Sequence, residues 1–173
     1  LTHTDNNATA SVNFGQRPFA YTPPSGHVSL CSKNLPDPTI ADGSTGMDVV
    51  TYTGTGNTKS ISSLGFQPDL VWFKQRSGGS LSGGRVHELI DSVRGVQKAL
   101  ESNDTTVEFT STGSLTSFNS DGFTIGSEDR VNENNASYVS WAWKAGGTAS
   151  TLTAGSVDAQ VSASTTYGFS VIT

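Results

Sequence analysis

One short apolar run constrains the fold of this chain more than any other feature. Leu70, Val71, Trp72 and Phe73 follow a Pro-Asp corner and combine β-branched with aromatic side chains. Such a run, bounded by turn residues, predicts a strand covered on both faces. The residues before it, from Asp48, have the pattern of a strand, a turn and a polar strand. The stretch 48–74 therefore predicts the start of a β domain.

The composition favours strands throughout. Only 14% of the residues are charged, there are 19 glycines, and Ser and Thr are the commonest polar residues. This profile is typical of short strands joined by tight turns. From Tyr138 to Lys144 apolar and polar residues alternate, so Val139, Trp141 and Trp143 share one face, and we expect a buried Trp there to anchor the core.

Three further segments complete the pattern of the central region. Residues 105–110 alternate, which predicts Val107 and Phe109 inward. Residues 115–118 and 123–126 predict a hairpin whose turn contains Asp121-Gly122. Residues 85–102 are ambiguous, because some of their apolar spacings suit a helix and others do not. The sequence therefore predicts an all-β chain with one segment of undecided type.

Both ends carry isolated strand patterns. Residues 10–21 predict one strand, followed by an extended exit that the prolines of Thr22-Pro23-Pro24 fix. At the other end, 169–173 partly repeats 49–53, as if a second copy began there, which predicts a module from an array. The first residue, Leu1, indicates a processed product or the visible part of a longer polypeptide.

Two stretches resemble known families. A resemblance to the last strand and tail of a SPRY domain covers about Val12 to Leu30 and is carried by the stretch NFGQRPFAYTPPSG. The phrases TYTGTGNTKSISSLGFQPDLVWFKQR, DSVRG, LTSFNSDGFTIGS and SYVSWAWKAGG resemble, in order, a repeated β-sandwich domain of tail and virion-associated proteins of marine phages. The Gly-Ser-rich stretch 76–84 departs from the ordinary turn of that family.

The resemblance implies an antiparallel β-sandwich of the jelly-roll, concanavalin or laminin-G type, with extended terminal strand segments and a structural or adhesive role. It also implies that DSVRG lies in strands and turns rather than in a helix. The organisation expected is a SPRY-like terminal strand and tail over 1–26, a linker over 27–46, the sandwich over 47–147, and a Ser/Thr-rich linker with a terminal strand over 148–173.

Several function classes are disfavoured by the sequence. The net charge of −5 and the few scattered Lys and Arg offer no basic patch for nucleic acid. No apolar run is long enough to insert in a membrane. Cys31 is the only cysteine and has no partner for an intrachain disulfide. The histidines, His3, His27 and His87, are too far apart in sequence to indicate a metal site.

The sequence predicts no catalytic site. A glycan hydrolase needs two carboxylates on one face, and the nearest pair, Glu88 and Asp91, flanks apolar residues and reads as a strand end. His87, Asp91 and a serine lack the nucleophile elbow of a hydrolase triad. Asp91 and Arg94 read as a local ion pair that holds a turn. The enzyme interpretation is therefore third among the function hypotheses.

Two weaker site hypotheses involve the loop that follows Gly126. Calcium is the ion its oxygen groups would suit best, with Glu128, Asp129 and Asn132 as candidate ligands, although the EF-hand spacing is absent. Otherwise the sequence predicts no cofactor. The same loop offers Asn134 and the adjacent Tyr138 as candidate glycan contacts. A solvated loop is the alternative for both.

The leading functional hypothesis follows from the isolated terminal strands. An unpaired strand leaves backbone groups without partners and invites pairing with another chain. We therefore expect a non-enzymatic structural subunit of an extracellular or virion assembly, such as a fibre, tube or tail appendage, with copies of itself or neighbouring subunits as partners. The residues expected at the contacts are Val12, Phe14, Phe19, Tyr21, Phe169 and Val171. The alternative is an adhesion module that binds cell-surface polysaccharide through Trp or Tyr.

Overall fold

The computed structural model describes residues 11–14, 17–30, 34–79 and 87–173. It divides into two units, Leu1–Ala41 and Asp42–Thr173. The described residues of the first unit contain no β-strand, so the strand predicted over 10–21 is not formed in the part of it that is described. Proline explains much of this, because Pro18, Pro23 and Pro24 lack the N–H that a ladder requires.

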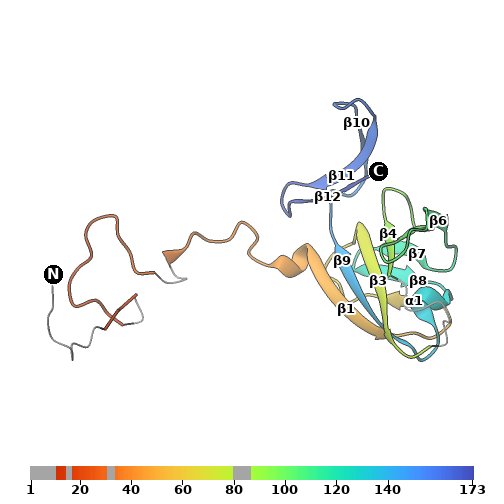
Figure 1. The fold of residues 1–173 in the computed structure, drawn as a ribbon, viewed down its shortest axis with the longest axis horizontal. Coiled ribbons are helices and arrows are strands. Elements are labelled where there is room, and N and C mark those ends of the chain that lie inside the picture. The colour runs from red at the N-terminus through yellow and green to blue at the C-terminus, as the bar shows by residue number, and fades with distance from the viewer. Residues whose placement is uncertain (1–10, 15–16, 31–33, 80–86) are drawn as a thin grey trace. The chain divides into compact units, whose positions relative to one another are not determined.

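The larger layer of the second unit is a six-stranded antiparallel sheet (Figure 1). Its spatial order is β1-β9-β3-β4-β5-β6, so the strand that closes the domain lies between the first and third strands. The strand bounds are Met47–Thr53 for β1, Ser137–Trp143 for β9, Leu70–Ser77 for β3, His87–Asp91 for β4, Lys98–Glu101 for β5 and Phe109–Thr110 for β6.

A three-stranded sheet packs against the inner face of this layer. It has the order β2-β8-β7, with bounds Lys59–Ile61, Gly122–Ile125 and Leu115–Asn119. The rings of Phe73 on β3 and Phe123 on β8 meet edge to face, with centroids 5.4 Å apart. Apolar residues of both sheets form one buried cluster. The predicted all-β fold of antiparallel sheets is confirmed, and the arrangement is compatible with a β-sandwich.

The predicted β7–β8 hairpin is confirmed, and glycine is required at its turn for a tertiary reason. β7 and β8 pair antiparallel on either side of the Asp121-Gly122 turn. A Cβ on Gly122 would collide with the backbone carbonyl oxygen of Ile61 on β2. The close approach of these two backbones is what allows β2 to pair with β8.

The prediction about which face of β9 is buried is wrong. Val139, Trp141 and Trp143 do share a face, but they are only half-buried, whereas Tyr138, Ser140 and Ala142 are buried on the other face. The same holds on β3, where Val71 and Phe73 are fully buried and Leu70 and Trp72 are not. Trp72, Trp141 and Trp143 therefore lie on the outer face of the six-stranded sheet, and β3 is not covered on both faces.

The ambiguous segment 85–102 forms strands and a turn in its described part. β4 and β5 pair antiparallel, and the DSVRG residues occupy the end of β4 and the turn after it. Asp91 accepts hydrogen bonds from the backbone N–H groups of Val93 and Arg94, at 3.0 and 2.8 Å, and pairs with the Arg94 side chain as predicted. Val107, expected inward, is 81% exposed.

The C-terminal residues form a third sheet rather than a linker with an isolated strand. β10 (Ser150–Leu152), β11 (Ala159–Ser164) and β12 (Phe169–Ile172) pair in that order. Phe169 stacks on Trp143 with centroids 6.1 Å apart, and Val171 is buried. The expectation that the C-terminal strand lacks a partner is wrong, because β11 satisfies it within the same chain.

Two short helical elements complete the described chain. They are a 3-10 turn, η2, at Gly43–Thr45, and one short helix, α1, at Asp129–Asn132. Across the described ranges no helix has the length and apolar character needed to cross a bilayer.

Candidate functional site

Asn132, a candidate calcium ligand, is an internal clamp. It is fully buried, and its Oδ1 accepts from the Thr55 N–H at 2.8 Å. Its Nδ2 donates to the carbonyl oxygens of Asn57 and Gly126, both at 2.6 Å. One side chain thus joins the turn after β1, the end of β8 and α1. Both N–H donors of this amide and one lone pair of its oxygen are therefore used within the protein.

The other two candidate ligands do not form a centre with it. Glu128 precedes α1 as its N-cap residue, without a capping hydrogen bond from its side chain, and Asp129 is exposed at the start of the helix. Within the described ranges, no three His, Cys, Asp or Glu residues lie close enough to hold a metal ion. His3 and Cys31 lie outside the described residues.

Tyr138, a candidate glycan contact, has no accessible face. It is fully buried and stacks on Tyr52 with ring centroids 5.2 Å apart. Its hydroxyl donates to the Asp129 carbonyl oxygen at 2.7 Å and accepts from the Glu133 N–H at 2.8 Å. Burial raises the pKa of Tyr138 to about 12. A sugar cannot stack on this ring, whereas Asn134 is exposed in the neighbouring loop.

Glu88 and Asp91 do not form a catalytic pair. They are three positions apart on one strand, and such positions point to opposite faces. Glu88 enters the core, and Asp91 is engaged by the turn that it caps. His87 points outward from the core and accepts, at Nδ1, a hydrogen bond of 3.2 Å from the Trp72 indole. The three residues are therefore not arranged as a hydrolase site.

Glu88 belongs to a buried polar group that sequence reasoning missed. Its register partner on β5 is Glu101, which forms an ion pair with Arg130 of α1. Neither carboxyl oxygen of Glu88 finds a hydrogen bond of good geometry in the described part of the chain. Burial raises the pKa of Glu88, and the nearby Ser114 hydroxyl and Arg130 lower it by less. The sequence signal for this buried group was Glu88 itself, because it shares a strand face with the apolar Ile90.

The outer face of the six-stranded sheet carries a row of large apolar side chains. Register partners run across five strands from β1 to β5, in the order Val49, Trp141, Trp72, Leu89 and Leu100. Every member is half-buried or exposed. The indoles of Trp72 and Trp141 lie 5.3 Å apart between centroids, tilted by 50°. We call this row, together with His87, the outer aromatic face.

The hydrogen bond from Trp72 sets the tautomer of His87 on the outer aromatic face. Because Trp72 donates to His87 Nδ1, the neutral imidazole carries its proton on Nε2. Burial, and then the neighbouring Lys74 ammonium, lower the pKa of His87. The ring is therefore neutral at pH 7 and acts as a donor at Nε2. Among the described residues none accepts a hydrogen bond from the Trp141 indole N–H.

A polar hollow of about 390 Å³ lies at the start of β3, lined by Gln67, Asp69, Ser92, Gly147, Thr148 and Ala149. Its buried carboxylate, Asp69, accepts from the Ser92 hydroxyl and from the Ala145 N–H, each at 2.8 Å. Asp69 therefore ties three segments of the chain together.

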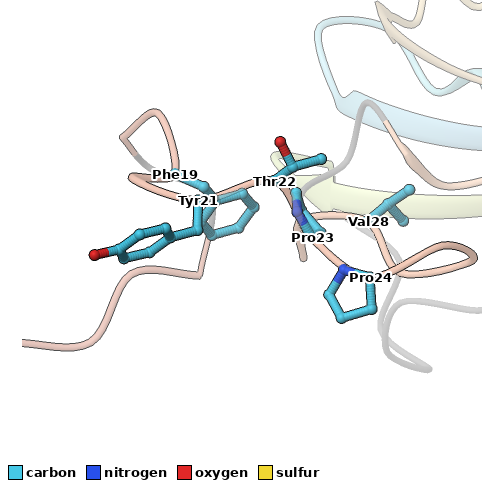
Figure 2. Close-up of a pocket in the computed structure, with 6 residues that line it drawn as sticks. All are labelled: Phe19, Tyr21, Thr22, Pro23, Pro24 and Val28. Atoms are coloured by element: carbon cyan, nitrogen blue, oxygen red, sulfur yellow. The ribbon is translucent and has the colours of Figure 1, made fainter.

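The first unit presents four of the six residues expected at assembly contacts, because Phe169 and Val171 lie on β12 of the second unit. Tyr21 is 88% exposed, and Val12, Phe14 and Phe19 are also exposed. An apolar hollow of about 300 Å³ lies along this segment. Figure 2 shows its lining residues, with the rings of Phe19 and Tyr21 at one end and Pro24 and Val28 at the other. The segment thus holds aromatic side chains on a proline-stiffened backbone. We call residues 17–28 the aromatic arm.

Fold and site define the class of this protein as an all-β domain with two packed antiparallel sheets and an apolar outer face. Residues 42–173 match the model of a family described as a domain of unknown function, DUF7483. The chain belongs to this family. The matched range begins where the second unit begins and includes the C-terminal sheet. No curated protein and no solved structure matches the chain.

Proposed function

We propose that this protein is a non-enzymatic structural subunit of an extracellular or virion assembly, joined to its neighbours through the aromatic arm. The observation that carries the proposal is the exposure of Phe19 and Tyr21 on a segment without strand partners in its described part. Large exposed aromatic residues gathered on one segment mark a contact surface.

The prolines support a contact made by side chains. Pro23 and Pro24 fix their φ angles, so the arm loses little conformational freedom when it binds. β1 is a seven-residue edge strand paired only with β9 among the described strands, so its outer backbone groups offer a second surface that a neighbouring subunit can contact. Strand donation by β12 is not part of the proposal, since β12 already pairs with β11.

The test is the mass of the full chain as its concentration rises, measured by sedimentation velocity. The wild type should form larger species, and the double variant Phe19→Ser with Tyr21→Ser should remain monomeric. Val157→Ser is the matched control, because Val157 is 79% exposed but lies in the second unit. A wild type that stays monomeric up to the millimolar range contradicts the proposal.

A second candidate function is carbohydrate adhesion, and the outer aromatic face favours it. Half-exposed indole rings can pack against the C–H face of a sugar ring, and the indole N–H group can donate a hydrogen bond to a sugar hydroxyl group. Binding of polysaccharides by the full chain on a glycan array tests this function without reference to any residue. No binding to any glycan would exclude it.

A further inference from the structure

The aromatic arm and the outer aromatic face are complementary surfaces carried by the same chain. We infer that the arm of one copy docks on the outer aromatic face of a second copy, with the Trp141 indole seated in the apolar hollow of the arm. The inference rests on the proposed function and names the surface that the arm contacts on its neighbour. The contact is heterologous, because each copy gives its arm and receives another.

The hollow of the arm has the volume and the lining that an indole requires. It measures about 300 Å³, with the rings of Phe19 and Tyr21 at one end and Pro24 and Val28 at the other (Figure 2). Ligand pockets in proteins begin at about this volume. Aromatic rings and prolines both pack well against an indole. A planar side chain such as Trp141 therefore suits this hollow.

The two surfaces also complement each other in hydrogen bonding. Among the described residues none accepts a hydrogen bond from the Trp141 indole N–H. The arm offers acceptors without matching donors, because Pro23 and Pro24 have carbonyl groups but no N–H. Of the carbonyl oxygens at Thr22, Pro23 and Pro24, only the last accepts a hydrogen bond in the described part of the chain, from the His27 N–H at 3.0 Å. The others remain for the indole of a neighbour.

The surroundings of Trp141 give the docked arm further apolar contacts. Its register partner on β3 is Trp72, whose ring centroid lies 5.3 Å away, and its register partner on β1 is Val49, which is 45% exposed. Trp72 is held by its hydrogen bond to His87, so this part of the face is ordered before the arm binds. Docking would remove these apolar side chains from water.

The prolines of the arm favour this face over the free edge of β1. A strand added to a sheet edge needs N–H donors and carbonyl acceptors along its length. Pro18, Pro23 and Pro24 interrupt the donors. A segment stiffened by proline binds aromatic surfaces through its side chains and carbonyl groups instead. The arm is therefore suited to the indoles of the outer aromatic face.

The experiment raises the concentration of the full chain and follows its mass and its tryptophan emission together. The chain has three tryptophans, and all of them lie on the outer face of the six-stranded sheet. The emission should shift to shorter wavelength over the concentration range in which the mass rises, because docking removes indole surface from water. Larger species with unchanged emission overturn the inference while the proposed function stands. A chain that stays monomeric in the millimolar range contradicts both.

Variants of Trp141 test the seat of the contact. Trp141→Val should raise the concentration needed for assembly at least tenfold. Trp141→Phe keeps a ring and removes only the N–H donor, so it should raise this concentration severalfold, and it remains informative if circular dichroism shows that Trp141→Val does not fold. Leu152→Ser is the matched control, because Leu152 is a half-exposed apolar residue of β10, and it should assemble as the wild type does. Unchanged assembly in the Trp141 variants overturns the inference.

A mixture of two variants tests that the arm and the face meet each other. The double variant Phe19→Ser with Tyr21→Ser keeps the face, and Trp141→Val keeps the arm. At a concentration where only the wild type assembles, an equimolar mixture of the two should form pairs. A mixture that stays monomeric overturns the inference. So does a glycan-array signal that Trp141→Val abolishes without weakening assembly, because that result assigns the face to carbohydrate.

Discussion

Asn132 offers the sharpest test of how the second unit is held together. Replacing it with Asp keeps the shape of the side chain and the oxygen that accepts from Thr55, but removes both N–H donors. The carbonyl oxygens of buried Gly126 and of exposed Asn57 would then face a carboxylate oxygen at the positions now 2.6 Å away. A buried acceptor left without a partner costs about 1–3 kcal/mol. Only the Gly126 carbonyl is fully buried, so we expect a loss of about 1–3 kcal/mol.

This loss is measurable by urea unfolding at pH 7. Taking about 2 kcal/mol and an m-value of about 2 kcal/mol per M, the midpoint should fall by about 1 M urea. Asn134→Asp adds the same charge to the same loop at an exposed position, and its stability should stay within about 0.5 kcal/mol of the wild type. The pair of variants therefore separates the clamp from a general effect of negative charge.

The same experiment decides between the clamp and the calcium hypothesis. A calcium site would gain a ligand from Asn132→Asp, and millimolar CaCl₂ would then stabilise the variant more than the wild type. The clamp predicts a destabilised variant that calcium does not rescue. If Asn132→Asp is as stable as the wild type, the three hydrogen bonds do not hold the unit as argued.

Two further predictions concern the core. Glu88→Gln should matter only above the pH at which Glu88 ionises: because burial raises its pKa in the folded state, its contribution to wild-type stability is fully present below about pH 4.5 and is lost as the pH rises. The variant should match the wild type near pH 4 and exceed it by about 1–3 kcal/mol near pH 8, and equal pH profiles in thermal unfolding would disprove the reasoning. Gly122→Ala should destabilise the protein by about 1–3 kcal/mol or more, since its Cβ would collide with the Ile61 carbonyl. Gly65→Ala, where a Cβ meets nothing within 4 Å, should be near neutral, and comparable losses in both variants would show that space at Gly122 is not the cause.

Local patterns predicted most of the strands but not their inner faces. The alternation of β9 correctly grouped Val139 with the two tryptophans, and the Asp121-Gly122 turn correctly marked a hairpin. Alternation gives the members of a face and leaves open which face another layer will cover. Hydrophobicity suggested the tryptophans, yet the second sheet covers Tyr138, whose hydroxyl finds two backbone partners inside.

The candidate sites were harder to predict, because each depends on contacts between distant segments. Asn132 looked like an ion ligand because its neighbours in sequence are polar. Its three partners belong to residues 55, 57 and 126, and no local pattern contains them. The outer aromatic face was missed for the same reason, since Trp72 and Trp141 are far apart in sequence and become neighbours only through strand pairing.

The sequence by itself determined that this chain forms an all-β domain, because turn residues and a period of two specify strands through local sterics and alternation. Only the tertiary structure decided that the tryptophans face outward, that Glu88 and Asn132 are buried, and that the last strand pairs within its own chain. These outcomes depend on which layer covers which face and on hydrogen bonds between remote segments, and such contacts are settled by packing of the whole domain.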